Sequence, residues 1–332
     1  MIREGGAATM GQAILSVDIG GTKVLAALVS PQGEVIDRVI ERTASLDGFD
    51  AVVEQLSKLA RLLAERHRGH AAPDAIALAV AGAIDVTRGV VTTSPNLPEW
   101  KEVPLRGIVS SRLGLPAYLI NDASAAALGE HRHGAGVGTN HMVFMTVSTG
   151  IGGGIVIDGK LYQGASGAAG EIGHMVIEVG GPLCGCGNSG CLEALASGTA
   201  IARDASERIA LGTFSSIPKF TRDGATITAE AVAMAAKQGD PLANEVISRA
   251  AQYLGAGLAN VVNIFNPEMV VVGGGVAQMG EMLLGPARVV VQEKAFALSA
   301  RAAKIVRARL GGDAGIVGAA VYAAEEMKGN KS

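Results

Sequence analysis

The segment from Glu171 to Glu193, EIGHMVIEVGGPLCGCGNSGCLE, contains all three cysteines of the protein. Cys184, Cys186 and Cys191 follow His174 within this segment. Three sulfur atoms and one imidazole nitrogen suit a tetrahedral Zn²⁺ site that is closed to solvent. The glycines between these residues allow a short chain to wrap tightly around one ion. We therefore predict a structural zinc site with these four residues as ligands.

Two other interpretations of the cysteines are open. They could be ordinary thiols of a reduced interior, with a satisfied histidine nearby, but clustering without a metal then needs another reason. A disulfide framework fits less well, because Cys184 and Cys186 are only two residues apart and the number of cysteines is odd. A chain of this length also buries a core without covalent cross-links.

Two carboxylates, Glu171 and Glu193, frame the predicted zinc loop. A metal-clamped loop would bring them together. Ionised carboxylate oxygens accept hydrogen bonds strongly from hydroxyl groups. The pair therefore predicts a binding site for a ligand with several hydroxyls, such as a sugar.

The segment that starts at Gln12 contains an apolar run, a Gly-Gly turn and a second apolar run, which predicts a β-hairpin. Asp18 ends the first run. The turn consists of Gly20, Gly21 and Thr22 and is followed by Lys23. Backbone N–H groups of such a turn can approach phosphate oxygens, and the threonine and lysine add donors. A hairpin without a ligand is the alternative.

A second hairpin of the same kind is predicted from Met142 to Gly164, with Ser148, Thr149 and Gly150 at its turn. The chain thus contains two copies of the same hairpin motif. Two such hairpins in a duplicated α/β chain indicate two lobes that close on a nucleotide.

Asn121 and Asp122 follow a short predicted strand and precede an alanine-rich predicted helix. This position is typical of a helix N-cap. It is also the mouth of the crevice where α/β proteins bind ligands, so Asp122 could accept a proton from a substrate hydroxyl. Upstream, Asn96 lies in a proline-rich loop, where its amide could bind a polyol or simply belong to a turn.

The composition describes a well-packed globular protein of 332 residues, with 48% hydrophobic and 18% charged residues. A net charge of −3 and the lack of a basic stripe argue against nucleic acid as a partner. The richest basic run, Arg301 to Arg309, alternates with apolar residues and is typical of an exposed edge. No signal-peptide or membrane-spanning pattern is present, so we expect a cytoplasmic protein.

These motifs together resemble the ROK family (repressor, open reading frame, kinase). They are DIGGTK at Asp18 to Lys23, SPNLPEW at Ser94 to Trp100, ND at Asn121 and Asp122, STGIGGG at Ser148 to Gly154, and the cysteine block. The resemblance covers residues 12 to 327, and the CxCGxxGC spacing is its most specific part. It implies an α/β protein with the actin-like ATPase (ribonuclease H-like) fold, two lobes and a cleft between them. The implied activity is ATP-dependent phosphorylation of a hexose.

The resemblance also assigns roles to residues. By this resemblance, Asp122 would be the catalytic base. It would also bind the sugar, together with Asn96, Asn121, Glu171, His174 and Glu193. Nucleotide binding would fall to Asp18, Gly20, Gly21, Thr22, Lys23, Thr149, Gly150, Gly273 and Gly274, with Asp18 contacting Mg²⁺ through water. His174 would bind zinc through one ring nitrogen and face the sugar with the other. Ser124 departs from the asparagine of many members, which puts fine positioning of the helix in doubt.

Glucose, phosphorylated on its 6-hydroxyl, is the leading predicted substrate because the sugar-binding set is complete. Kinases for N-acetylmannosamine, N-acetylglucosamine, mannose or fructose share most of these residues, and the donor could be ATP or polyphosphate. ROK repressors sense sugars and regulate DNA, but the first hairpin begins so near Met1 that we expect no DNA-binding domain ahead of it. A noncatalytic relic is disfavoured because Asp122 and both turns are intact. We expect a homodimer or a homotetramer.

The predicted lobes are discontinuous. Residues 12–122 form a small lobe that a C-terminal helix, 313–328, completes. Residues 123–312 form a large lobe that contains the zinc loop, 174–191.

Overall fold

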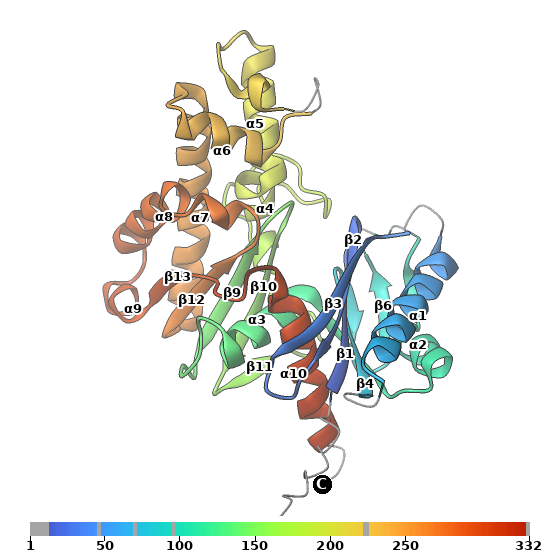
Figure 1. The fold of residues 1–332 in the computed structure, drawn as a ribbon. Helices are drawn as coiled ribbons and strands as arrows, with labels where there is room; N and C mark the ends of the chain where they lie inside the picture. The colour runs from blue at the N-terminus through green and yellow to red at the C-terminus, as the bar shows by residue number, and fades with distance from the viewer. Residues whose placement is uncertain are drawn as a thin grey trace, which may run out of the picture. The chain divides into compact units, whose positions relative to one another are not determined.

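The computed structural model describes residues 13–44, 48–68, 72–94, 97, 99–221 and 226–329. Contacts divide the chain into two compact units. The first unit spans 1–134, 163–169 and 313–332, and the second spans 135–162 and 170–312. Each unit contains a five-stranded sheet, and the two sheets have the same strand topology (Figure 1).

The sheet of the first unit has the order β3-β2-β1-β4-β8. Its strands are β1 (Ala13–Ile19), β2 (Lys23–Val29), β3 (Val35–Arg42), β4 (Pro73–Val80) and β8 (Ala117–Asn121). The first three are antiparallel neighbours, and β4 and β8 run parallel to β1. Strands β1 and β4 are buried along almost their whole length, as expected for apolar runs that are covered on both faces. The unit also contains α1 (Phe49–Arg66), α2 (Leu105–Leu113) and a small sheet of β5 (Ala83–Asp85), β6 (Val90–Thr93) and β7 (Lys101–Val103).

Two helices complete the first unit, α3 (Asp122–His133) and α10 (Ala314–Gly329). They approach so closely that a Cβ atom on Gly318 would overlap the carbonyl group of Ala125. Ser16 of β1 donates its hydroxyl to the carbonyl oxygen of Ile316 at 2.6 Å. In Figure 1, α10 is the red helix that runs beside the blue strands. The sequence-based boundary at residue 122 separates α3 from the first unit, whereas this close packing groups α3 with it.

The sheet of the second unit has the order β11-β10-β9-β12-β13. Its strands are β9 (Met142–Val147), β10 (Ile151–Ile157), β11 (Lys160–Tyr162), β12 (Met269–Gly273) and β13 (Lys304–Arg307). Again the first three are antiparallel neighbours, and β12 and β13 run parallel to β9. The structure therefore shows the predicted duplication as a repeat of topology, with one hairpin turn between the first two strands of each sheet.

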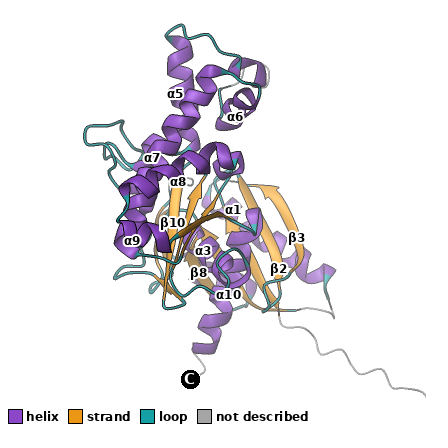
Figure 2. Ribbon diagram, turned by 90° about the vertical axis from the view of Figure 1, so that its left-hand side faces the viewer, coloured by secondary structure: helices purple, strands orange, loops and turns teal. Residues whose placement is uncertain are grey.

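Helices cover the sheet of the second unit, and α7, α8 and α9 lie side by side (Figure 2). Its α-helices are α4 (Leu192–Ala196), α5 (Gly198–Ala210), α6 (Ala229–Lys237), α7 (Pro241–Phe265), α8 (Glu281–Lys294) and α9 (Ala297–Ala302). Short 3₁₀ turns are η2 (Ile172–His174), η3 (Ile217–Phe220), η4 (Val276–Met279) and, where the chain passes to the first unit, η5 (Gly311–Asp313). One apolar core joins the strands to helices α4 to α8. Among the described residues, no helix has both the length and the apolar composition needed to span a bilayer.

Candidate functional site

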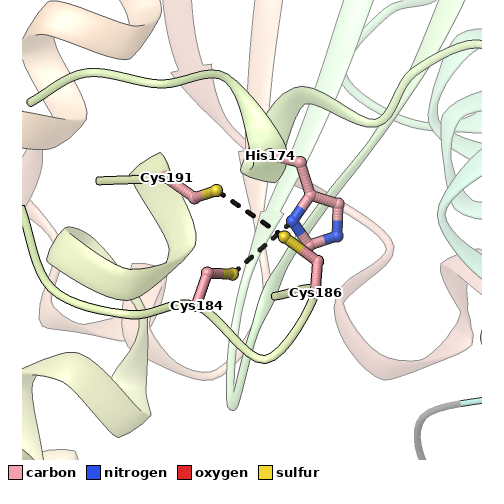
Figure 3. A group of neighbouring side chains, drawn as sticks. All are labelled: His174, Cys184, Cys186 and Cys191. Carbon is pink, nitrogen blue, oxygen red and sulfur yellow. Dashed lines mark hydrogen bonds between the residues drawn. The ribbon is translucent and has the colours of Figure 1, made fainter. Parts of the chain in front are cut away.

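The structure brings the four predicted zinc ligands together in the second unit (Figure 3). The ligand atoms of His174, Cys184, Cys186 and Cys191 all lie within 4.8 Å of one another. The Cys184 Sγ atom is 3.7 Å from His174 Nδ1, and the sulfur atoms of Cys186 and Cys191 are 3.8 Å apart. Zinc–sulfur bonds of about 2.3 Å in a tetrahedron separate two sulfurs by about 3.8 Å. The ligand types and these two distances therefore fit a tetrahedral zinc ion.

A tight backbone hairpin holds these ligands. Cys184 donates its N–H to Asn188 O at 2.7 Å, and Gly190 donates to Pro182 O at 2.8 Å. Gly190 has a φ of +74°, and a Cβ atom there would overlap the carbonyl group of Glu178. Only glycine fits this position, so the glycine content of the segment serves the loop geometry.

The thiols of the cluster differ in acidity. Burial raises the pKa of the Cys184 thiol to about 12, whereas the backbone N–H of Asn188 lowers the pKa of the exposed Cys186. A zinc ligand must be a thiolate, so binding has to displace the tightly held proton of Cys184.

Both framing carboxylates lie beside the cluster. Glu171 Oε2 is 3.8 Å from His174 Nε2, the ring nitrogen that does not face Cys184. On the other side, Cys184 donates its thiol to Glu193 Oε1 at 3.6 Å. The second oxygen of Glu193 accepts the N–H of Ile151 at 2.8 Å, at the start of β10. No motif or spacing in the sequence indicates this last contact.

The first glycine-containing turn joins β1 to β2 in the first unit. Gly20 donates its N–H to Lys23 O at 3.0 Å, which closes the turn. Asp18, the last but one residue of β1, points toward the first turn of α10, where a Cβ atom on Gly315 would lie 3.1 Å from Asp18 Oδ2. The absence of a side chain at Gly315 therefore leaves room for the carboxylate.

Asp18 has an unusual acidity. It keeps part of its surface exposed, but the surrounding protein atoms displace most of the water from its carboxylate. Burial and, to a smaller extent, the negative charge of Asp122 raise its pKa from 3.8 to about 7, and Lys23 opposes both. A carboxylate whose ionised form is disfavoured in this way, beside a glycine-rich turn, is typical of a functional site.

Because the pKa of Asp18 is higher in the folded than in the unfolded protein, the folded state binds this proton more tightly. This contribution to stability is complete below about pH 4 and is lost as the pH rises through 7. At pH 8 the free energy of unfolding of Asp18→Asn should therefore exceed that of the wild type by at most about 4 kcal/mol. Its melting temperature should be correspondingly higher, and the difference should shrink toward pH 4. Melting curves across this range check it. Equal melting temperatures at pH 8 would show that the carboxylate carries no such cost.

The second turn joins β9 to β10. Ser148 donates its N–H to Gly150 O at 2.8 Å, and a Cβ atom on Gly150 would overlap the Glu193 carboxylate. The predicted adenosine-binding glycines are close by, since Gly273 pairs with Thr146 of β9. Gly274 has a φ of +89° and lies against the carbonyl group at the end of β9. The structure thus gathers the predicted nucleotide-binding residues of this unit at one end of its sheet.

Asn121 and Asp122 both lie at the start of α3, where the sequence predicted a cap and a ligand site. Asn121 is the N-cap of α3, because its Oδ1 accepts the N–H groups of Ala123 and Ser124, each at 3.0 Å. Its amide also donates to Gly82 O at 3.2 Å. Asp122 is the first residue of α3, and its Oδ1 accepts the Ala123 N–H at 2.9 Å. Asn96, the remaining predicted sugar ligand, lies outside the described residues.

Comparison with known proteins agrees with the resemblance seen in the sequence. The model of the ROK family matches residues 14–326. A glucokinase of Thermotoga maritima is 38% identical over 95% of this chain and 98% of its own. An N-acetylmannosamine kinase of Shigella flexneri is 37% identical over 94% of this chain and 99% of its own. The crystal structure of a ROK family glucokinase from Streptomyces griseus, in complex with glucose and AMPPNP, superposes with a TM-score of 0.82 at 37% identity and covers 94% of this chain and 99% of that one.

These similarities span nearly the whole chain and include both repeated sheets. They confirm the predicted fold class, an α/β protein with the actin-like ATPase fold. With the Cys₃His cluster in place as well, the chain belongs to the ROK family.

Proposed function

We propose that the protein is an ATP-dependent hexose kinase that phosphorylates the 6-hydroxyl of glucose. The observation that carries the sugar part is the placement of Glu171, His174 and Glu193 around one metal-binding cluster. Carboxylates and an imidazole so fixed can hydrogen-bond several hydroxyls of one ligand. The kinase part is supported by the relatives, of which the Streptomyces griseus structure holds glucose and an ATP analogue.

In this proposal each part of the sugar site has its own task. Glu171 and Glu193 accept hydrogen bonds from sugar hydroxyls, and His174 binds zinc through Nδ1 and the sugar through Nε2. Asn121 and Asn96 add amide groups. Bound zinc keeps Glu171, His174 and Glu193 in one arrangement.

Asp122 is the proposed catalytic base. It accepts the proton of the 6-hydroxyl while the hydroxyl oxygen forms a bond to the γ-phosphorus of ATP and the bond to the β,γ-bridging oxygen breaks, which releases ADP. Gly21, Thr22 and Lys23 in the first unit, and Thr149 and Gly150 in the second, offer N–H, hydroxyl and ammonium donors to the phosphates, and Gly20 closes the first turn. Asp18 contacts Mg²⁺ through water, and Gly273 and Gly274 bind the adenosine.

An assay of ADP release from ATP over a panel of hexoses tests this function. The panel comprises glucose, N-acetylmannosamine, N-acetylglucosamine, mannose and fructose, and polyphosphate replaces ATP in a second series. The panel is needed because the identities to the glucokinase and to the N-acetylmannosamine kinase, 38% and 37%, are nearly equal. The highest kcat/KM should be that for glucose with ATP.

A sugar sensor is the alternative from another functional class. It would bind glucose in a calorimeter yet release no ADP with any acceptor, and that result would overturn the kinase proposal. We further predict Mg²⁺ dependence, a cytoplasmic location, an assembly into homodimers or homotetramers, and two lobes with a boundary at residue 312.

A further inference from the structure

Each of the two hairpin turns, β1–β2 and β9–β10, accepts hydrogen bonds from one threonine that belongs to no motif. In the first unit, Thr43 follows β3, donates its hydroxyl to Gly20 O at 2.6 Å and donates its N–H to Thr22 O at 3.0 Å. In the second unit, Thr199 lies in the first turn of α5 and donates its hydroxyl to Thr149 O at 2.8 Å and its N–H to the same oxygen at 3.3 Å. In both units, a threonine thus donates its hydroxyl and its N–H to carbonyl oxygens of the hairpin turn.

These contacts fix the direction of the turn peptides. A trans peptide is planar, so the carbonyl group of one residue and the N–H group of the next point in opposite directions. Thr43 holds Gly20 O and thereby directs the N–H of Gly21 away from Thr43. Thr199 does the same for the N–H of Gly150 by holding Thr149 O.

The second turn receives a further donor. Gly198, which begins α5, donates its N–H to Ser148 O at 2.7 Å, which directs the N–H of Thr149 in the same way. The first N–H groups of a helix have no partner within the helix, so α5 can supply them to the turn. Within the described residues, neither Thr149 nor Gly150 donates its N–H to another protein group. Both N–H groups remain for an anion.

We infer that Thr43 and Thr199 are positioning residues of the phosphate-binding turns. They draw the carbonyl oxygens of the turns away from the bound phosphates and thereby present the N–H groups to them, which favours a polyanion. This inference rests on the proposed function, because it takes the two turns as the phosphate-binding elements of a kinase. Neither threonine needs to touch the nucleotide.

The test compares valine and serine at both positions. Thr43→Val and Thr199→Val keep the shape of the side chain but remove the hydroxyl donor, whereas Thr43→Ser and Thr199→Ser keep the donor. Each valine variant should bind a nonhydrolysable ATP analogue about 3- to 10-fold more weakly in a calorimeter, the effect of one lost hydrogen bond. The serine variants should stay within about 3-fold of the wild type, and glucose affinity should be unchanged in all four.

Thr221→Val is the matched control, because the Thr221 hydroxyl also donates to a carbonyl oxygen, that of Pro218 at 2.8 Å, but lies outside both turns. It should leave nucleotide affinity unchanged. If the valine variants instead lose glucose and nucleotide affinity in parallel with a lower melting temperature, the threonines only support the fold and the inference is wrong. Valine variants with wild-type nucleotide affinity would also overturn it.

Nucleotide binding is measured without turnover, so the outcome does not depend on the acceptor. A wild-type protein that binds the analogue but phosphorylates no hexose would contradict the proposed function and leave the threonine comparison valid. In an active protein, the KM for ATP should rise in the valine variants while the KM for the sugar stays constant, which a purely structural role would not produce.

Discussion

Asp122→Asn should lower kcat by about 10² to 10⁴-fold, the usual contribution of a general base, and leave the melting temperature nearly unchanged. Asparagine has the shape of aspartate but accepts no proton from the substrate. The fold should tolerate the change because Asn121, and not Asp122, caps α3 with its side chain. Steady-state kinetics of ADP release and a thermal melt of the same sample provide the two measurements.

The matched control for this variant is Asp158→Asn. Asp158 is an exposed aspartate in the turn between β10 and β11, where its side chain is 84% exposed. It should leave kcat and the melting temperature unchanged. An Asp122→Asn protein that retains near-normal kcat but melts early would assign Asp122 a role in the helix start alone.

Cys184→Ser should remove about one zinc per chain and weaken glucose binding at least about 10-fold, because a neutral hydroxyl is a poor zinc ligand and one lost thiolate opens the tetrahedron. Without the ion, the loop that carries Glu171, His174 and Glu193 loses its fixed geometry. The contact between Glu193 and the Ile151 N–H extends this effect to the second turn. We therefore expect a smaller loss, about 3- to 10-fold, in affinity for the ATP analogue.

Metal analysis and two calorimetric titrations measure these effects at a temperature where a thermal melt shows the variant to be folded. Chelation of the wild-type protein should give the same two losses, and added zinc should restore both affinities. If nucleotide affinity is unaffected while glucose affinity falls, the contact between Glu193 and Ile151 does not transmit the loss of zinc to the second turn. If both are lost only as the protein unfolds, the cluster serves the fold alone.

Sequence patterns predicted those parts of the structure that depend on neighbouring residues. The amphipathic spacing from Pro241 to Ile264, followed by Asn266 and Pro267, indicates one long helix, and α7 spans Pro241–Phe265. The spacing of the cysteines sufficed for the cluster, because a short loop can bring its own residues together. The segment from Lys304 to Leu310 is typical of a strand along its whole length, but β13 ends at Arg307, where its partner β12 reaches its glycines.

Contacts between distant segments could not be predicted in this way. Thr43 and Thr199 belong to no motif, and their role depends on which carbonyl oxygens the fold places beside their hydroxyls. The second contact of Glu193 depends on the pairing of β9 with β10, which no spacing encodes. The sequence also could not show which residue of the Asn121–Asp122 pair caps α3, because the cap depends on the direction of the Asn121 side chain.

The return of α10 to the first unit has a consequence for synthesis on the ribosome. Domains generally fold as they emerge, beginning with the N-terminal one. Here β1 to β8 and α3 emerge early, but the helix that packs against Ser16 and α3 is translated after all the elements of the second unit. Nascent chains therefore carry an incomplete first unit, with the α10-facing surface of β1 and α3 uncovered, until residue 329 leaves the exit tunnel. During that interval this apolar surface is open to chaperones.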